Sequence, residues 1–422
     1  MTAPAAITDT HTNPNPSAPK PTDLRAERLR ALPPFLFNAI DDKKRAAIAA
    51  GKDVINLGVG DPDRPTPQFV IQAMRQALDQ PANHQYPDCY GTKRFLGAAA
   101  AFMRRRFGVA CDPARHMVAC IGSKDGIGHL PLGLLNPGDG AVVFTPAYPV
   151  YAAGTVLAGA TVHRVATSAA TRWLPDFDDP ATAHAAQRSR LVWLNFPGNP
   201  TGASADTALL DKAVRFCQRH GPVIASDLAY SEIYFDANGP ASAPSLWQAP
   251  SARLDDTPAI EFHSLSKTFN MTGWRLGFAV GHPAVIAALK QTKDNYDSGP
   301  FNAIQDAGAV ALERFDDPAI AEMRREYTTR RDLVVAGLRR VGCVVEPPHA
   351  GIFVWARTPA SRSTGRPMDS WQFVERAIEE AAVVMVPGAG FAETAHDFVR
   401  VSLTRQTDRI AQAMERLASV TW

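Results

Sequence analysis

The stretch that decides the fold is His263-Ser264-Leu265-Ser266-Lys267-Thr268-Phe269-Asn270-Met271-Thr272-Gly273-Trp274-Arg275. It lies between two apolar runs of the kind that form strands, 259–262 and 276–280. The amine of Lys267 can form a Schiff base with an aldehyde, and the hydroxyl groups beside it, together with Arg275, can hold a nearby dianion. The stretch therefore predicts a covalent amine site beside an anion site. A single lysine in a polar loop is more often merely solvated, so the rest of the chain must decide.

Segments typical of strands and helices alternate through the middle of the chain. The strand-like segments are 117–121, 141–144, 191–194, 223–225, 260–263 and 276–280. Helical patterns between them predict an α/β fold whose largely parallel sheet is covered on both faces. Ligands bind such sheets at the carboxyl ends of the strands. Polar stretches stand at those positions, at 145–148, 195–202, 226–230 and 264–267. Four such strand ends are harder to obtain by accident than one motif.

The turn Gly122-Ser123-Lys124-Asp125-Gly126 separates the strand 117–121 from an apolar helical run. The N-terminus of such a helix presents free N–H groups, so the turn predicts a phosphate site. The glycine-rich loop 58–63 would let backbone approach a ligand. Either segment is also compatible with an ordinary turn. Directly after that loop, Thr66 is expected to cap a helix whose first residue is Pro67.

The C-terminal part of the chain predicts a smaller α+β unit. Its expected strands are 344–345, 353–355, 383–386 and 399–403, and its expected helices are 371–381 and a final one from 408. We therefore expect a disordered tail over 1–23, the N-terminal part of the small domain over 24–70, a large cofactor-binding domain over 71–310 and the C-terminal part of the small domain over 311–422.

Composition restricts the function classes. The chain has 422 residues and a formal net charge of +2, so it offers no strong field for nucleic acid or anionic membranes. This length favours two domains. No apolar run reaches the length of a membrane span, and the N-terminus lacks the pattern of a signal peptide. The five cysteines are scattered without a CxxC pair, which predicts reduced thiols in a cytoplasmic protein. No metal site is predicted.

The polar groups at the strand ends match the needs of pyridoxal 5'-phosphate (PLP). Lys267 would hold the aldehyde and act as the catalytic residue, and Asp227 would keep the pyridine nitrogen protonated. The other expected contacts are Asn199 and Tyr230 at the 3'-oxygen, Tyr148 on the ring face, and Ser123, Lys124, Ser264, Ser266 and Arg275 at the phosphate. Arg400 would bind the α-carboxylate of a substrate through a bidentate guanidinium.

Each of these residues also has a structural interpretation. Tyr148 and Tyr230 are compatible with aromatic residues whose rings lie in the core and whose hydroxyl groups contact water. Asp227 is compatible with a helix cap, and Arg400 with the solvent face of an alternating strand. The conjunction of all of them favours the cofactor site.

These motifs resemble those of a known enzyme family. From about Leu24 to the C-terminus the chain resembles the fold-type I PLP-dependent aminotransferases of class I/II, and it is most similar to the LL-diaminopimelate aminotransferases and their relatives. The most specific motifs are Asn199-Pro200-Thr201-Gly202, Asp227-Leu228-Ala229-Tyr230 and Ser264-Leu265-Ser266-Lys267. Further stretches are 55–63, 122–127, 148–151, 263–277 and 297–305. The resemblance implies a large domain with a mostly parallel seven-stranded sheet between helices, and a smaller α+β domain.

The resemblance implies further roles. Gly60 would offer backbone to the substrate carboxylate, and Asn199 would lie beside the substrate as well as the cofactor. Tyr86 would reach the phosphate of a neighbouring subunit in a homodimer, with Asn302 at the same shared site. Lys124 is a candidate for contact with the distal end of the substrate. Phe35 stands where many relatives have tyrosine, which weakens the substrate assignment but leaves the cofactor assignment intact.

The implied reaction moves an amino group from an amino acid to 2-oxoglutarate by a ping-pong mechanism. The expected amino donor is LL-2,6-diaminopimelate, an intermediate of lysine biosynthesis. The alternatives are an alanine/glutamate or N-succinyl-diaminopimelate transaminase, or a PLP-dependent β-lyase or decarboxylase on the same scaffold. A PLP-binding regulator fused to a DNA-binding module is a further class. Only about two dozen residues precede the fold, too few for a helix-turn-helix domain.

Overall fold

A seven-stranded sheet forms the larger part of the molecule in the computed structural model, which describes residues 23–32, 37–235 and 239–422. Its strand order is β2-β8-β7-β6-β5-β3-β4. The strands are β2 (Met117–Cys120), β3 (Gly140–Thr145), β4 (Thr161–Ala166), β5 (Leu191–Asn195), β6 (Val223–Asp227), β7 (Ala259–Ser264) and β8 (Gly277–Gly281). Strands β4, β3, β5, β6 and β7 run parallel, whereas β8 is antiparallel to both β7 and β2. The predicted α/β fold with a mostly parallel sheet is confirmed.

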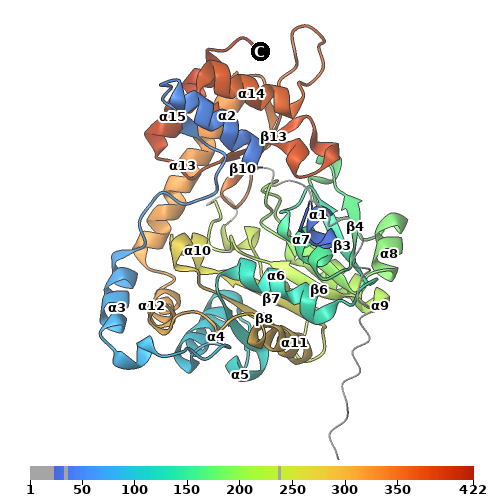
Figure 1. Cartoon of the computed structure of the whole chain (residues 1–422), viewed down its shortest axis with the longest axis vertical. Coiled ribbons are helices and arrows are strands. Elements are labelled where there is room, and N and C mark those ends of the chain that lie inside the picture. The colour runs from blue at the N-terminus through green and yellow to red at the C-terminus, as the bar shows by residue number, and fades with distance from the viewer. Residues whose placement is uncertain (1–22, 33–36, 236–238) are drawn as a thin grey trace, which may run out of the picture.

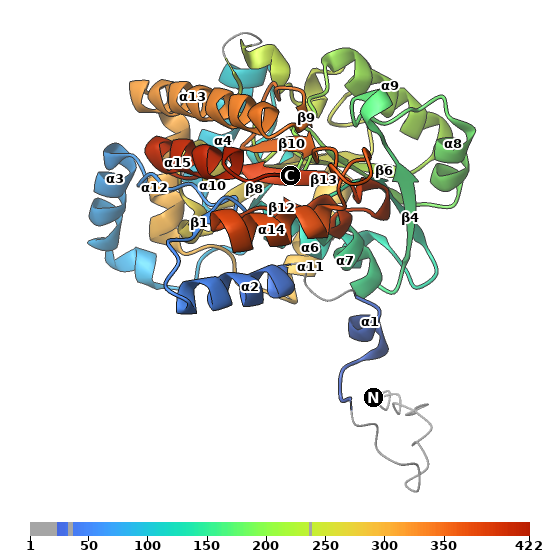
Figure 2. The same cartoon turned by 90° about the horizontal axis from the view of Figure 1, so that it is seen from above.

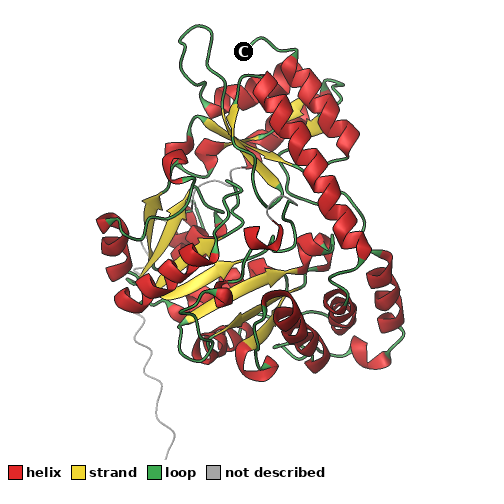
Figure 3. Ribbon diagram, turned by 180° about the vertical axis from the view of Figure 1, so that it is seen from behind, coloured by secondary structure: helices red, strands yellow, loops and turns green. Residues whose placement is uncertain are grey.

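Helices cover both faces of this sheet (Figure 3). Successive side chains of a strand point to opposite faces, and β3 shows this, since Val142 belongs to one buried cluster while Ala141 and Val143 belong to another. The first cluster includes side chains of α4 (Lys93–Phe107), α8 (Pro180–Gln187), α9 (Thr207–His220) and α12 (Asn302–Glu313). The second includes side chains of α6 (Ser123–Leu134), α7 (Val150–Leu157) and α11 (Pro283–Asp294).

A second, smaller sheet lies above the first in Figure 1 and is antiparallel, with the order β12-β13-β10-β9. Its strands are β9 (Val344–Val345), β10 (Phe353–Arg357), β12 (Val386–Pro387) and β13 (Phe398–Ser402). The helices α2 (Phe37–Ala49), α13 (Pro318–Arg340), α14 (Ser370–Ala381) and α15 (Thr407–Ala418) lie in this part (Figure 2). It is the α+β unit that the sequence predicts. A parallel pair, β1 (Ile55–Asn56) and β11 (Val383–Val384), joins the N-terminal region to it.

The remaining elements are one further helix, α3, and several short segments. They are α1 (Glu27–Arg30), α3 (Gln68–Leu78), α5 (Pro113–His116) and α10 (Leu265–Thr268), with 3-10 turns at Pro81–His84, Ala169–Thr171, Gly239–Ser242, Leu246–Gln248, Thr272–Trp274, Gly388–Gly390 and Glu393–Ala395. Helix α1 contacts α7, as Figure 2 also shows. Among the described helices, none has the length and apolar character needed to cross a membrane.

The structure corrects three sequence-based expectations. The residues of the edge strand β4 are not among the predicted strand segments. The predicted strand 383–386 is two strands that belong to different sheets, since β11 pairs with β1 and β12 pairs with β13. Thr66 does not cap α3, because its hydroxyl donates to the carbonyl of Asn270 and Pro67 occupies the cap position.

Phe35 and residues 1–22 of the expected tail lie outside the described residues. The domain boundaries at 70/71 and 310/311 stay predictions.

Candidate active site

The carboxyl ends of the parallel strands bring the predicted polar residues together. Asn195 and Asp227 are the last residues of β5 and β6 and are paired across the two strands. Ser264 ends β7, and α10 with Lys267 follows at once. In Figure 1 this helix lies between the large sheet and the smaller unit above it. The site is therefore built where the rule for parallel sheets expects it.

Lys267 contacts the glycine-rich loop 58–63, which is distant from it in the sequence. Its Nζ donates a hydrogen bond of 2.6 Å to the carbonyl oxygen of Gly60. Burial lowers the pKa of Lys267 to about 8, and the positive charges of Arg275 and Arg400 act in the same direction while Asp61 opposes them. A substantial fraction of this amine is therefore neutral near physiological pH, which a nucleophilic amine requires.

Asp227 is a buried carboxylate with only one oxygen firmly bonded. The hydroxyl of Tyr151 donates to its Oδ2 at 2.8 Å, and the side chain of Asn195 donates to its backbone carbonyl at 2.8 Å. Its Oδ1 is buried and has no hydrogen-bond partner among the described residues. Burial raises the pKa of Asp227 to about 6, although the hydrogen bond from Tyr151 and the nearby N–H of Ala229 act against this. A buried acceptor without a partner indicates that a ligand donor belongs there.

Arg400 projects from β13 and is almost fully buried, with 3% of its surface exposed. Its Nη1 donates to Oδ1 of Asn199 at 2.8 Å, and its Nη2 donates to the carbonyl of Gly58 at 2.6 Å. The guanidinium carbon lies 4.1 Å from the ring centre of Phe353. Burial lowers the pKa of Arg400 to about 10, so the group stays charged at neutral pH. The predicted solvent-facing alternative for this arginine is wrong.

The turn at the start of α6 packs against Arg275. Gly122 has the positive φ of 74°, and a Cβ there would lie 2.3 Å from Nη2 of Arg275. The guanidinium thus lies directly against the N-terminus of α6, where N–H groups and the helix dipole favour an anion. Ser123 begins this helix and is half-buried. Ser264 and Ser266 are buried, and the Oγ of Ser264 accepts from the N–H of Ser266 at 3.2 Å.

Two predicted tyrosines lie in the same region. Tyr148 is in edge-to-face contact with Tyr151, with ring centres 5.9 Å apart. Tyr230 is in a similar contact with Phe353 at 6.0 Å. Burial raises the pKa of Tyr148 and of Tyr230 above the ordinary value, so both hydroxyls keep their protons at neutral pH. They can therefore donate hydrogen bonds.

Three other predicted residues are exposed or lie beside an exposed segment in the single chain. Tyr86 is 91% exposed, and Lys124 is exposed at the start of α6. The amide of Asn302 donates to the carbonyl of Gln85 at 3.4 Å, so Asn302 lies beside the segment that carries Tyr86. The roles proposed for these three residues remain predictions.

Several residues at the site were not predicted. Asn195 bonds both the Asp227 carbonyl and, through its Oδ1, the N–H of Asn199 at 2.8 Å. Its position at a strand end is the signal that could have identified it. Phe353 lies under Arg400, and its Cζ would be 2.5 Å from a Cβ at Gly60. Phe353 gives no sequence signal beyond that of an ordinary core aromatic. Tyr151 lies in the stretch 148–151 that carries the family resemblance, but nothing in that stretch indicates its bond to Asp227.

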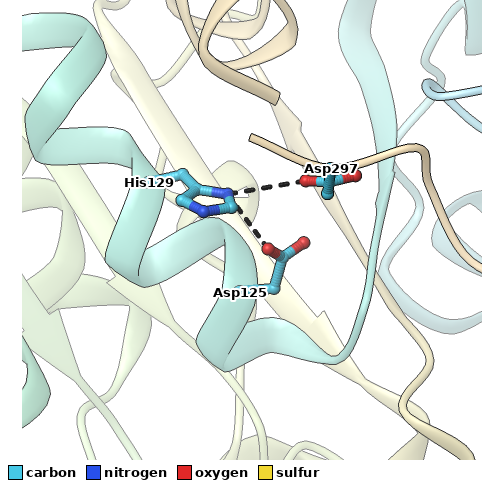
Figure 4. Close-up of side chains that lie close together, drawn as sticks. All are labelled: Asp125, His129 and Asp297. Atoms are coloured by element: carbon cyan, nitrogen blue, oxygen red, sulfur yellow. Dashed lines mark ion pairs between the residues drawn. The ribbon is translucent and has the colours of Figure 1, made fainter. Parts of the chain in front are cut away.

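An internal ion cluster lies next to the first turn of α6 (Figure 4). Nδ1 of His129 is 3.0 Å from Oδ1 of Asp125 and 3.7 Å from Oδ2 of Asp297. These three side chains could present ligand atoms within 4.8 Å of one another. The ammonium of Lys293, which is 0% exposed, already bonds both carboxylates at 3.0 and 2.9 Å. We therefore interpret the cluster as an ion network that fixes α6 to the segment after α11.

Comparisons with known proteins agree with the geometry of the strand ends. A sequence model of the family "Aminotransferase class I and II" matches residues 52–417. The chain belongs to the class I and II aminotransferases. An LL-diaminopimelate aminotransferase of Nitratidesulfovibrio vulgaris is 44% identical over 94% of this chain and 98% of its own length. One of Aquifex aeolicus is 41% identical over the same shares. The solved aspartate aminotransferase of Thermus thermophilus with maleate is 28% identical, with a TM-score of 0.83, over 93% of this chain and 98% of its own.

This aminotransferase is a PLP-dependent enzyme, as the sequence predicts. Its residues fit the cofactor on independent structural grounds. The unpartnered Oδ1 of Asp227 suits the N–H of a pyridinium ring, and the amine of Lys267 suits an aldehyde. The anion-binding helix N-terminus beside Arg275 suits a phosphate.

Proposed function

We propose that the chain is an LL-diaminopimelate aminotransferase that uses 2-oxoglutarate as amino acceptor and serves lysine biosynthesis. The observation that supports this choice of substrate is the name shared by relatives that are 40–44% identical over 93–94% of the chain. An alanine/glutamate or N-succinyl-diaminopimelate transaminase and a β-lyase are the competing outcomes of the test.

We assign the cofactor contacts as follows. Oδ1 of Asp227 would accept from the pyridine N–H, and the ring of Tyr148 would stack on the cofactor. The 3'-oxygen and phosphate contacts would be Asn199, Tyr230, Ser123, Lys124, Ser264, Ser266 and Arg275. When bound, the cofactor supplies an electron-accepting ring that carries the amino group between the two substrates.

Lys267 would perform the proton transfer. Its Nζ, once free, would remove the proton from the substrate α-carbon as a general base and return it as a general acid. Burial suits this role, because the lowered pKa of about 8 leaves a neutral amine available. The carbonyl of Gly60, which accepts from Nζ in the free enzyme, holds the amine in the site before the reaction.

Arg400 would bind the α-carboxylate. Asn199 and Gly58 hold its guanidinium by two hydrogen bonds, and the ring of Phe353 supports it from one side. A guanidinium held in this way loses little freedom when it pairs with a carboxylate in the bidentate geometry. The backbone of Gly60 would complete the carboxylate site.

We further propose a homodimer in the cytoplasm. The exposed ring of Tyr86 and the neighbouring amide of Asn302 would complete the active site of the partner subunit. The Oδ1 of Asn302 is buried with no partner in the described part of the chain, which suits contact with a second subunit or a substrate. The five cysteines are free, which supports a reducing compartment.

The test is a spectral titration of the purified holoenzyme with LL-diaminopimelate, L-alanine, L-glutamate and L-aspartate, each added alone. Conversion of the bound cofactor to its amine form by LL-diaminopimelate at far lower concentration than by the others supports the proposed substrate. Preference for alanine or glutamate contradicts it, and release of ammonia with the cofactor left in its aldehyde form indicates a lyase. In parallel, Lys267→Ala is expected to lose turnover and the visible absorbance of the bound cofactor, while the exposed control Lys43→Ala keeps both.

A further inference from the structure

The carboxylate of Asp227 has two oxygens with different surroundings. Oδ2 accepts a hydrogen bond of 2.8 Å from the hydroxyl of Tyr151, whereas Oδ1 is buried and has no partner among the described residues. The cofactor-facing oxygen and the protein-facing oxygen are therefore distinct. Tyr151 is itself a fully buried residue at the start of α7, so its hydroxyl has no solvent alternative to this bond.

Tyr151 is held in place from two sides. Its ring stacks on Trp193 of β5 with centres 4.9 Å apart and planes at 20°, and it meets the ring of Tyr148 edge to face. Burial and the Asp227 charge raise the pKa of Tyr151 well above its ordinary value. The phenol therefore stays protonated at neutral pH and acts only as a donor to Oδ2, which favours the ionised form of the carboxylate.

We propose that Tyr151 is a positioning residue for the cofactor: by donating to Oδ2 it keeps Asp227 ionised and aims Oδ1 at the pyridine nitrogen. This inference rests on the proposed role of Asp227. Burial alone disfavours a charged Asp227, and a hydrogen bond to the charged form counteracts that effect. The hydroxyl of Tyr151 thus sets how readily Asp227 can pair with a protonated ring nitrogen.

Other groups also face Asp227 and must be considered in any pH experiment. Tyr148 and Tyr230 are neutral phenols close to Asp227, and the negative charge of the carboxylate adds to burial in raising the pKa of both. His263 on β7 favours the ionised form of Asp227. Asn195 of β5 contacts only the backbone carbonyl of Asp227 and carries no charge. A change at Tyr151 alone leaves all of these groups in place.

The experiment measures how tightly the apoenzyme binds pyridoxamine 5'-phosphate, which forms no covalent bond to Lys267, as a function of pH in Tyr151→Phe. The phenylalanine ring keeps the stacking on Trp193 and removes only the hydroxyl. We expect about 10- to 100-fold weaker binding, the usual effect of a hydrogen bond to a charged group. The acid limb of the binding profile should move to higher pH, because a carboxylate that loses a donor binds a proton more readily.

Tyr90→Phe is the matched control. It removes a phenol–carboxylate hydrogen bond of the same kind, 2.6 Å to Asp294, at a place away from Asp227. Thermal unfolding of both apoenzymes shows that they are folded. Unchanged affinity and an unmoved acid limb in Tyr151→Phe overturn the proposal, as does weaker binding without the pH shift, which indicates a purely structural role. The variant Asp227→Asn separates the two proposals. If Asp227→Asn binds pyridoxamine 5'-phosphate normally, the proposed role of Asp227 is wrong. If Asp227→Asn loses affinity while Tyr151→Phe does not, only the inference about Tyr151 is wrong.

Discussion

Nζ of Lys267 lies 2.6 Å from the carbonyl oxygen of Gly60, although 207 positions separate the two residues in the sequence. This bond joins the helix after β7 to the loop after β1. A Cβ at Gly60 would lie 2.5 Å from the Cζ of Phe353, so a larger residue at this position would force the loop or the ring to move. The free enzyme therefore holds its nucleophile in position before the cofactor enters.

The first prediction concerns the pH dependence of cofactor uptake. Only the neutral amine of Lys267 attacks an aldehyde, and burial lowers its pKa to about 8. The rate at which the apoenzyme takes up pyridoxal 5'-phosphate should rise with pH and level off above about 8. Stopped-flow absorbance measures this rate. A rate that keeps rising to the ordinary lysine pKa of 10.5 would contradict the effect of burial.

The second prediction concerns Arg400→Lys. Lysine keeps the positive charge, but its three N–H donors cannot make the bonds to Asn199 and Gly58 together with two parallel bonds to a carboxylate. We expect KM for the amino donor to rise about 10- to 100-fold, since a charge-assisted hydrogen bond is worth about 1.5–3 kcal/mol. The absorbance of the bound cofactor should not change. Arg409→Lys, at an exposed pair with Asp53, is the control, and equal effects of both substitutions would reject the role of Arg400.

Much of the fold could be predicted from the sequence because the buried strands are short apolar runs between helical patterns. The strand β4 could not, because it lies at the edge of the sheet and Val165 is its only buried residue. Without a buried face it shows no apolar alternation. The two-way split of residues 383–386 depends on pairing with β1 and β13, which local sequence does not encode.

The centre of the site could be predicted for a simple reason: parallel strands end at one edge, so polar residues after them must meet. Asn199, Asp227 and Lys267 follow that rule. Tyr151 and Phe353 do not, because a buried aromatic ring in a helix or a strand has the same sequence pattern whether it supports a core or a charged group. Their contacts with Asp227 and Arg400 are visible only in three dimensions.

The third prediction compares two glycines of the α6 region. Gly122→Ala places a methyl group 2.3 Å from Nη2 of Arg275, in a backbone conformation (φ 74°, ψ 156°) that is almost restricted to glycine. We expect it to cost about 1–3 kcal/mol of stability and to weaken cofactor binding, because the guanidinium must move. Gly128→Ala, in the same helix with open space around it, should be neutral or slightly stabilising. Urea unfolding and cofactor titration measure both, and normal binding by Gly122→Ala would argue against a phosphate site at this turn.

The fourth prediction concerns the ion cluster beside α6 and starts from Lys293, whose ammonium bonds the carboxylates of Asp125 and Asp297 in a fully buried position. Lys293→Met fills the space of the side chain but leaves two carboxylates without their cation. Removing one partner of a buried ion pair typically costs about 3–5 kcal/mol, whereas Lys43→Met at an exposed pair should cost about 1 kcal/mol or less. The free energy of unfolding in urea measures this difference. A loss no larger than that of the control would show that the cluster does not stabilise α6.

The same variant has a predicted pH signature. Burial would raise the pKa of Asp125, but His129 and Lys293 outweigh this effect and lower it from 3.8 to about 2. A carboxylate with a lowered pKa in the folded state stabilises the protein above its unfolded pKa and loses that contribution as the pH falls through its folded pKa. Wild-type protein should therefore lose stability between pH 3.8 and about 2. Lys293→Met has already lost one source of the lowered pKa, so the difference in stability between the two proteins should narrow over this range. A difference that stays constant on acidification would mean that Lys293 contributes by packing and not by its charge.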